Sequence, residues 1–453
     1  MRSPRWSPPT GGRWRPRRPP PRREHGPVTT LLLLQLLAIL VAARGCGLLL
    51  RRFGQPAVVG EMAAGVLLGP VVFGQLWPAT HAALFPAASL APLSALATLG
   101  LVLFMFVVGA ELRAPQGLRS QVRAAGLVGA CAFFVPMAMG LVLAVWLYPA
   151  LAPDGLAFWP FALFFAAAMS ITAFPVLARI LKDRGMTRTG VGQLSLNAAA
   201  LADVFTWMLL ALILALAGGG DGYAGFTRVA GGLLLIVALV FLVLRPLYAW
   251  LLRRHPLDED GATVSFGLLL AGMLACAAAT EWVGLHAVFG AFLFGACLPR
   301  DDRLLAVLIE RIEHIAVVAL MPIFFALAGL GMSADAFTGG SVGVLAAIVA
   351  VAVAGKVAGG ALGARLAGHP WRPSLAVGSL MNARGLMELV VIKVGLDAGL
   401  IGPVLFTMLF AMAILTTVMT GPLLALLARG PRPAVQLEGG AAGGSASGGG
   451  LDT

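Results

Sequence analysis

A series of long apolar segments limits what this chain can fold into more than any other feature of its sequence. Short polar stretches separate thirteen such segments, which lie at approximately 28–50, 56–72, 93–112, 124–149, 159–181, 191–218, 229–252, 263–282, 284–299, 314–332, 341–367, 373–397 and 402–428. A helix needs about 20 apolar residues to cross the hydrocarbon core of a bilayer. The chain is 59% hydrophobic and 11% charged, with a mean hydropathy of +0.92, which excludes an ordinary soluble domain. We therefore expect an all-α membrane protein with about 13 transmembrane helices.

The basic residues of the connecting loops alternate along the chain. They follow the odd-numbered segments, as Arg51 and Arg52, Arg113, Arg119 and Arg123, Lys182, Arg184 and Arg188, Arg253 and Arg254, Arg300, Arg303 and Arg311, Arg365 and Arg372, and Arg429 and Arg432. Loops after even-numbered segments hold only Arg228. Because cytoplasmic loops carry the excess of Lys and Arg, we expect a multi-pass protein of the cell membrane with a cytoplasmic C-terminus.

The two ends of the chain differ from the apolar region between them. Residues 1–27 are rich in Arg and Pro, and we expect a disordered leader there. With a cytoplasmic C-terminus, thirteen segments place the N-terminus outside, whereas the positive charge of the leader favours the cytoplasm. The leader is therefore either translocated or absent from the mature protein, or one segment is miscounted. Residues 28–430 form the expected membrane domain, and residues 431–453 form a flexible tail rich in Gly and Ser.

Asp203 is the only ionisable side chain of segment 191–218 and lies near its middle. A carboxylate at that depth costs about 2.5–3.5 kcal/mol on insertion scales, so such residues face a protein interior or a water-filled cavity. They usually belong to an ion or proton pathway, although a purely structural salt bridge is the alternative. We interpret Asp203 as the centre of the site.

An internal repeat is visible within the sequence. Residues 57–68 match residues 287–298 at five positions, and the run LFMFVVG ending at Gly109 resembles IFFALAG ending at Gly329. The matched segments are seven apart in order, so the two halves would have opposite orientations in the membrane. Chance similarity between Gly- and Ala-rich helices is the alternative. Inverted-topology repeats are typical of secondary transporters, whose sites lie at interrupted helices in the two halves.

Two corresponding segments carry signals of such an interruption. In segment 159–181, Pro175 lacks an N–H and frees the carbonyl of Ile171, beside the hydroxyls of Ser170 and Thr172. Free oxygens of this kind suit a monovalent cation. Segment 373–397 carries polar and charged residues in its middle that no lipid-facing helix would hold, namely Asn382, Arg384 and Glu388. We expect two crossed, interrupted helices.

Lys356 is a further charge in the middle of an apolar segment, and it needs a carboxylate partner unless it loses its charge. Structural pairing is as plausible for it as a role in transport, and we treat Glu61 and Glu111, near segment ends, as structural. The four cysteines, Cys46, Cys131, Cys276 and Cys297, show neither metal-ligand spacing nor a disulfide pattern. We expect no cofactor, no metal centre and no nucleic-acid partner.

Five runs of sequence resemble the transport domain of the cation:proton antiporter superfamily, the Kef-type and sodium/hydrogen exchanger proteins. The runs are SITAFPVLARILKDRG from Ser170, AALADVFTW from Ala199, GLHAVFGAFLFG from Gly284, MPIFFALAGLGM from Met321 and MNARGLMELVVIKVGLDAGLI from Met381. The resemblance covers approximately residues 31–427. It implies a thirteen-helix homodimer in which a core domain with the two crossed helices moves against a dimerisation domain.

The resemblance also assigns roles to residues. Asp203 matches the aspartate that binds either the proton or the cation, Lys356 matches the basic residue of the neighbouring core helix, and Thr172 falls in the unwound segment. Ala202 is a departure, because relatives place an acidic residue, Asn or Gln before the aspartate, and the charge stoichiometry depends on this difference. Kef-type systems continue into a nucleotide-binding domain, and we expect no such gating within this polypeptide.

Three classes of function remain to be weighed. A cation:proton antiporter, exchanging Na⁺ or K⁺ for protons, explains the repeat, both interruptions and the two buried charges. A sodium-coupled symporter or a cation channel could share the architecture, but a symporter would show coordination by Asn, Gln and Ser more plausibly than one titratable aspartate. An enzyme would need a nucleophile with a base, and His286 has no such companion in the sequence.

Overall fold

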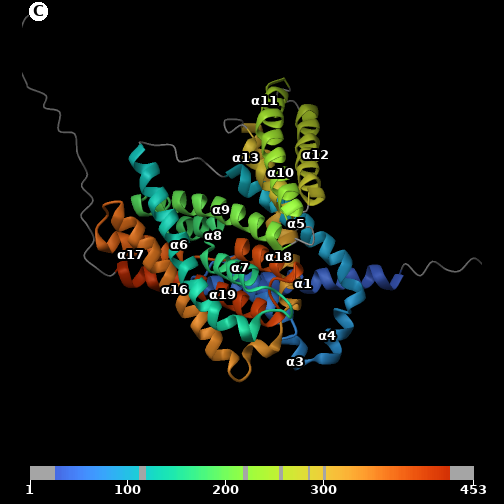
Figure 1. The fold of residues 1–453 in the computed structure, drawn as a ribbon. Coiled ribbons are helices and arrows are strands. Elements are labelled where there is room, and N and C mark those ends of the chain that lie inside the picture. The colour runs from blue at the N-terminus through green and yellow to red at the C-terminus, as the bar shows by residue number, and fades with distance from the viewer. Residues whose placement is uncertain are drawn as a thin grey trace, which may run out of the picture.

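The structure is a computed structural model that describes residues 26–111, 119–217, 223–254, 259–283, 286–298 and 303–428 (Figure 1). All regular structure within these residues is helical. Ten helices of the described part are long and apolar enough to cross a membrane, and two shorter apolar helices accompany them. The expected class of all-α membrane protein is confirmed, whereas the exact count of thirteen spans stays a prediction. Nearly all of the expected leader and the whole of the expected tail lie outside the described residues.

The helices that build the fold are α1 (Gly26–Arg52), α2 (Ala57–Leu68), α5 (Leu90–Glu111), α6 (Arg119–Leu151), α7 (Phe158–Ser170), α8 (Phe174–Asp183), α9 (Gly190–Ala217), α10 (Tyr223–Leu239), α11 (Arg245–Arg254), α12 (Glu259–Val283), α13 (Ala287–Cys297), α14 (Arg303–Ile315), α15 (Met321–Leu330), α16 (Ser341–Leu366), α17 (Trp371–Met381), α18 (Leu386–Asp397) and α19 (Pro403–Ala428). Short helices α3 (Phe73–Leu76) and α4 (Pro78–Leu84) lie between α2 and α5. Single π-helical turns, Val240–Leu244 and Ala316–Leu320, join α10 to α11 and α14 to α15.

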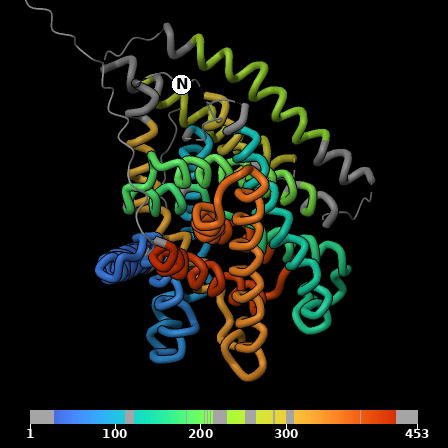
Figure 2. The backbone as a smooth tube through the Cα atoms, turned by 90° about the vertical axis from the view of Figure 1, so that its left-hand side faces the viewer, coloured from blue at the N-terminus to red at the C-terminus, as the bar shows by residue number. Residues whose placement is uncertain are grey.

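The helices pack as two groups. The first group comprises α1, α2, α5 and α12 to α15, and the second group comprises α6 to α9 and α16 to α19. Within each group the helices pack extensively on one another, whereas the main contacts between the groups are those of α2 with α19. Figures 1 and 2 show α9 crossing over the second group, with α10 to α13 standing apart from it. Apart from α10, which contacts both α12 and α9, the described helices therefore form two groups that share a limited interface.

Glycines let helices of the first group approach closely. A Cβ atom added to Gly329 of α15 would lie 1.9 Å from the carbonyl oxygen of Gly65 in α2. A Cβ atom on Gly295 of α13 would likewise lie 2.1 Å from the carbonyl oxygen of Phe106 in α5, and one on Gly109 would lie 2.2 Å from that of Phe292. Small residues at such crossings allow backbone-to-backbone packing, which drives helix association in membranes.

The glycine contacts correspond to the repeat expected from the sequence. The repeat matches α2 with α13 and the end of α5 with the end of α15. It therefore relates the packing of α2 on α15 to the packing of α13 on α5, and both crossings use the matched glycines. This correspondence supports the inverted repeat, which remains a prediction.

We predict that Gly329→Ala lowers the melting temperature of the protein and reduces its free energy of unfolding by about 1–3 kcal/mol, because the added methyl group forces α15 away from α2. Gly343 of α16 is a matched control, since a Cβ atom there meets nothing within 4 Å. Gly343→Ala is expected to be neutral or slightly stabilising, by up to about 1 kcal/mol. Thermal unfolding of the two purified variants checks the prediction, and equal melting temperatures would contradict it.

Both expected helix interruptions are present in the second group. Helix α7 ends at Ser170 and α8 begins at Phe174, with Ile171 and Ala173 in extended conformations between them. Helix α17 ends at Met381 and α18 begins at Leu386. Gly385 before α18 has φ 152°, a conformation that residues other than glycine rarely adopt.

The two interruptions lie against each other. The backbone N–H of Ala173 donates to the carbonyl oxygen of Ala383 over 3.1 Å, and the hydroxyl of Thr172 donates to the carbonyl oxygen of Met381 over 3.3 Å. Hydrogen bonds between the two breaks thus satisfy backbone groups that have no partner within a helix. An irregular backbone at membrane depth requires such partners. Four helix ends meet at one place in the second group.

Candidate ion-binding site

Asp203 lies on α9 beside this meeting of helix ends, and its side chain is only 1% exposed. Neither carboxylate oxygen has a hydrogen-bond partner among the described residues. The backbone N–H of Phe174, the first residue of α8, and the ammonium group of Lys356 both act favourably on its negative charge. The amide belongs to a helix N-terminus, which carries a partial positive charge. Asp203 is therefore a buried acid at the break, and its two carboxylate oxygens accept no hydrogen bond from the described residues.

Lys356 projects from α16 towards the same break and is fully buried. Its ammonium group donates to the hydroxyl of Thr172 over 2.6 Å, to the carbonyl oxygen of Ala132 on α6 over 3.1 Å, and to the carbonyl oxygen of Ser170. These three oxygens match the three donors of an ammonium group. The described residues include no ion pair between Lys356 and Asp203, so the lysine is held by oxygens rather than by that acid.

The residues that the sequence places in the first break have distinct positions. Thr172 stands between Lys356 and the second break, since its hydroxyl accepts from the lysine and donates to Met381. The Ser170 hydroxyl instead donates to the carbonyl oxygen of Ala166 over 2.8 Å within α7, and it is the Ser170 carbonyl that meets Lys356. Pro175 occupies the first turn of α8, where its missing N–H has no helical partner to lose.

Arg384 lies in the second break and is fully buried. Its guanidinium group donates to the carbonyl oxygens of Ala168 over 3.0 Å and Met169 over 2.5 Å, and forms a 3.0 Å ion pair with Glu388. Together with Lys356 it caps the last carbonyl groups of α7, the negative end of that helix dipole. One cation from α16 and one from the second break thus hold the C-terminal end of α7 in place.

Asn382 and two threonines of α19 complete the second break. The amide of Asn382 donates to the carbonyl oxygen of Thr416 over 3.0 Å, and the Thr417 hydroxyl both accepts from the N–H of Arg384 and donates to its carbonyl oxygen. The sequence analysis missed Thr416, Thr417 and the Ala132 carbonyl. Adjacent threonines inside an apolar segment were a usable signal, whereas a backbone carbonyl leaves none.

A cavity of about 550 Å³ separates the two groups near the site. It extends between α2, α5 and α8 and is lined by Glu61, Val176 and Arg179, among others. Val176 is the third residue of α8, so the cavity approaches the end of the helix that faces Asp203, although Asp203 does not line it. No group of three or more His, Cys, Asp or Glu residues suited to a metal ion occurs in the described part of the chain.

The fold and the site together define an integral membrane protein with two crossed, interrupted helices around a buried carboxylate, the arrangement of secondary transporters. The profile of the family described as "Sodium/hydrogen exchanger, transmembrane" matches residues 36–430. The chain belongs to this family, and the resemblance noted from its motifs is confirmed.

Several characterised proteins are similar over most of this chain. Na(+)/H(+) antiporter NhaS4 of Synechocystis is 40% identical over 397 residues, covering 87% of this chain and 96% of the relative. Cation/H(+) antiporter 17 of Arabidopsis thaliana is 35% identical over 395 residues, covering 87% of this chain and 48% of the relative. K(+)/H(+) antiporter 1 of Saccharomyces cerevisiae is 34% identical over 410 residues, covering 88% of this chain and 46% of the relative. The chain therefore spans about half the length of the plant and yeast proteins.

A solved structure shares the fold. The sodium proton antiporter MjNhaP1 from Methanocaldococcus jannaschii, at pH 8, superposes with a TM-score of 0.63 over 89% of this chain and 99% of that one. The two sequences are 16% identical, so the likeness concerns the fold alone.

Proposed function

We propose that this protein exchanges a monovalent cation, Na⁺ or K⁺, for protons across the membrane, with Asp203 binding either ion in turn. The observation that carries the proposal is the pair of unpartnered oxygens on a fully buried carboxylate, opposite the N-terminus of α8. Such a group either binds a proton or requires a cation, because an isolated charge is costly at membrane depth. The names of the similar antiporters agree with this function.

Alternating access would require the second group of helices to move against the first. The limited interface between the groups, and the cavity that opens there, support this motion. The homodimer and the cytoplasmic C-terminus remain part of the proposal, supported by the family resemblance and by the loop arginines respectively. The choice between Na⁺ and K⁺ depends on the spacing of oxygens around the bound ion.

We predict electroneutral exchange of one proton for one cation, because Ala202 offers no second acid beside Asp203. Lys356 is the group that could alter this number, by losing a proton when the cation arrives. Its three oxygen partners accept the three hydrogen bonds of an ammonium group, and one-for-one exchange requires that Lys356 keep this proton throughout the cycle. The measurement is the rate of Na⁺-driven proton movement in proteoliposomes, with and without a membrane potential imposed by K⁺ and valinomycin.

A rate that follows the potential would contradict one-for-one exchange, and Lys356→Ala would then show whether the lysine carries the second proton. The same assay, repeated with K⁺ as the substrate in the absence of valinomycin, separates the two cations. It also separates the antiporter from the remaining candidate, a sodium-coupled symporter or cation channel, since neither of these moves protons against the cation.

A further inference from the structure

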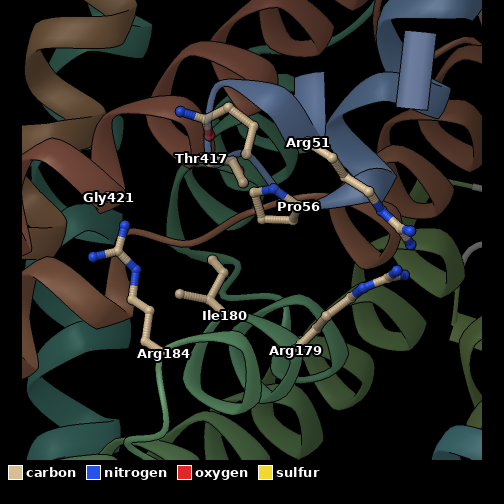
Figure 3. A pocket seen from close by; sticks show the side chains of 9 residues that line it. Arg51, Pro56, Arg179, Ile180, Arg184, Thr417 and Gly421 are labelled. Atoms are coloured by element: carbon tan, nitrogen blue, oxygen red, sulfur yellow. The ribbon is translucent and has the colours of Figure 1, made fainter. Parts of the chain in front are cut away.

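A second cavity, of about 500 Å³, lies where the turn between α1 and α2 meets α8 and α19. Its walls include Arg51 from the end of α1, Gln55 from the turn, Arg179 and Arg184 from α8 and its end, and Thr417 and Gly421 from α19 (Figure 3). Helix α1 and the turn belong to the first group of helices and the other elements belong to the second group. The cavity therefore bridges the interface between the two groups, at the membrane face that carries the arginine-bearing loops.

Three guanidinium groups line this cavity, and no acidic residue is among its described walls. None of the three forms a hydrogen bond or an ion pair with another described residue. Figure 3 shows the guanidinium groups of Arg51 and Arg179 next to each other in the view, with Arg184 across the opening. Like charges gathered in this way repel one another unless an anion lies between them.

The described residues compensate these charges only in part. Glu61 is the acid on which Arg51 and Arg179 act electrostatically, but it lines the other cavity and forms no ion pair in the described part of the chain. Arg184 is directed at Gly421, where a Cβ atom would lie 2.7 Å from its Nη2 atom. A glycine at this position leaves the space that the guanidinium group occupies.

We propose that this cavity binds the phosphate group of an anion. Guanidinium groups bind phosphate through pairs of parallel N–H···O bonds, and the three that line this cavity offer several such pairs to a phosphorylated anion. The amide of Gln55 adds a neutral donor, while the Thr417 hydroxyl is already bonded to Arg384 and Ala413. The phosphate can come from an anionic lipid headgroup or from a soluble phosphorylated compound, and both chemistries fit a cavity of this size.

A bound anion would link the two groups of helices. It would link Arg51 of the first group with Arg179 and Arg184 of the second, and Thr417 in the same wall contacts Arg384 at the helix break. Anion binding would therefore hold one arrangement of the groups and slow exchange. The binding does not depend on the proposed function, whereas the slowing does.

The test of binding uses the purified full-length protein in neutral detergent, titrated calorimetrically with inorganic pyrophosphate and with ATP. A parallel arm compares melting temperatures in nanodiscs of phosphatidylcholine with and without phosphatidic acid. Arg51→Gln and Arg184→Gln are each expected to weaken binding by about tenfold or more. Both arginines are exposed and unpaired, so their substitution should leave the fold intact. Arg51→Lys, which keeps the positive charge but not the paired N–H donors of the guanidinium group, should retain part of the affinity.

The matched control is Arg188→Gln, which removes an exposed arginine from the same loop as Arg184 without touching the cavity. Pyrophosphate or ATP binding that depends on Arg51 and Arg184 supports a soluble ligand, and stabilisation by phosphatidic acid alone with the same dependence supports a lipid headgroup. Absence of binding in both arms, or an equal loss with Arg188→Gln, would overturn the site.

The consequence for transport is tested in proteoliposomes that contain whichever probe binds, either pyrophosphate or ATP on both sides or phosphatidic acid in the membrane. The expected result is slower exchange in the wild type and no slowing in the double variant Arg51→Gln, Arg184→Gln. Binding without any effect on the exchange rate would overturn the bridging role. A protein that binds the anion but shows no exchange at all would instead contradict the proposed function, so the two failures are distinguishable.

Discussion

Asp203→Asn is expected to abolish cation-driven proton movement while leaving the protein folded. An amide has nearly the shape of the carboxylate but can neither release a proton nor neutralise a bound cation. Because the carboxylate is buried without a hydrogen-bond partner among the described residues, removing its charge should keep or raise the melting temperature. The measurement is the exchange rate of the reconstituted variant, which should fall to that of protein-free liposomes.

Two further variants sharpen this prediction. Asp203→Glu keeps a titratable group at the break and should retain some exchange with an altered apparent cation affinity. Asp397→Asn removes an exposed carboxylate of α18 that pairs with Lys393 and should leave the rate unchanged. Transport by reconstituted Asp203→Asn at the wild-type rate would refute the role of this residue.

Arg384→Met is expected to produce the largest loss of stability in the site. The substitution leaves Glu388 buried without its cation and removes the donors that cap the carbonyl groups of Ala168 and Met169. Removing one partner of a buried ion pair costs about 3–5 kcal/mol, because the remaining charge has lost its compensation. The melting temperature of the purified variant, measured beside the wild type, gives the size of the loss.

Helix α18, which carries Glu388, offers a matched control. Lys393 and Asp397 form an ion pair with the same spacing of four residues as Arg384 and Glu388, but their side chains are 34% and 59% exposed. Lys393→Met is expected to change the stability by less than about 1 kcal/mol. Replacing both members of the buried pair by Met should be milder than Arg384→Met alone. If Arg384→Met lost no more stability than Lys393→Met, the stabilising role assigned to Arg384 would be contradicted.

The charged residues of the site could be identified from the sequence because charge is rare in apolar segments. Asp203, Lys356 and Arg384 each stand out against hydrocarbon-like surroundings, and the structure brings the elements that carry them to the two crossed breaks. The breaks themselves could be located from Pro175 and from the polar residues after Met381. Local chemistry was sufficient for these features.

The partners of those residues required the three-dimensional arrangement. The sequence offered a carboxylate as the partner of Lys356, whereas the structure places carbonyl oxygens of α6 and α7 and the Thr172 hydroxyl around it. Every residue has a backbone carbonyl, so no pattern shows which ones a broken helix leaves free. The cavity lined by Arg51 and Arg184 joins loops that are far apart in sequence, and alternation of charge alone could not bring them together.

The central claim is that a proton and a cation compete for Asp203, and proton release on cation binding tests it most directly. NaCl or KCl is added to the purified protein in weakly buffered solution, with choline chloride as the control for ionic strength, and the released protons are counted. Competition at one carboxylate predicts release of about one proton per chain at a pH where Asp203 is protonated, and none from Asp203→Asn. Equal proton release from the wild type and Asp203→Asn would contradict the account.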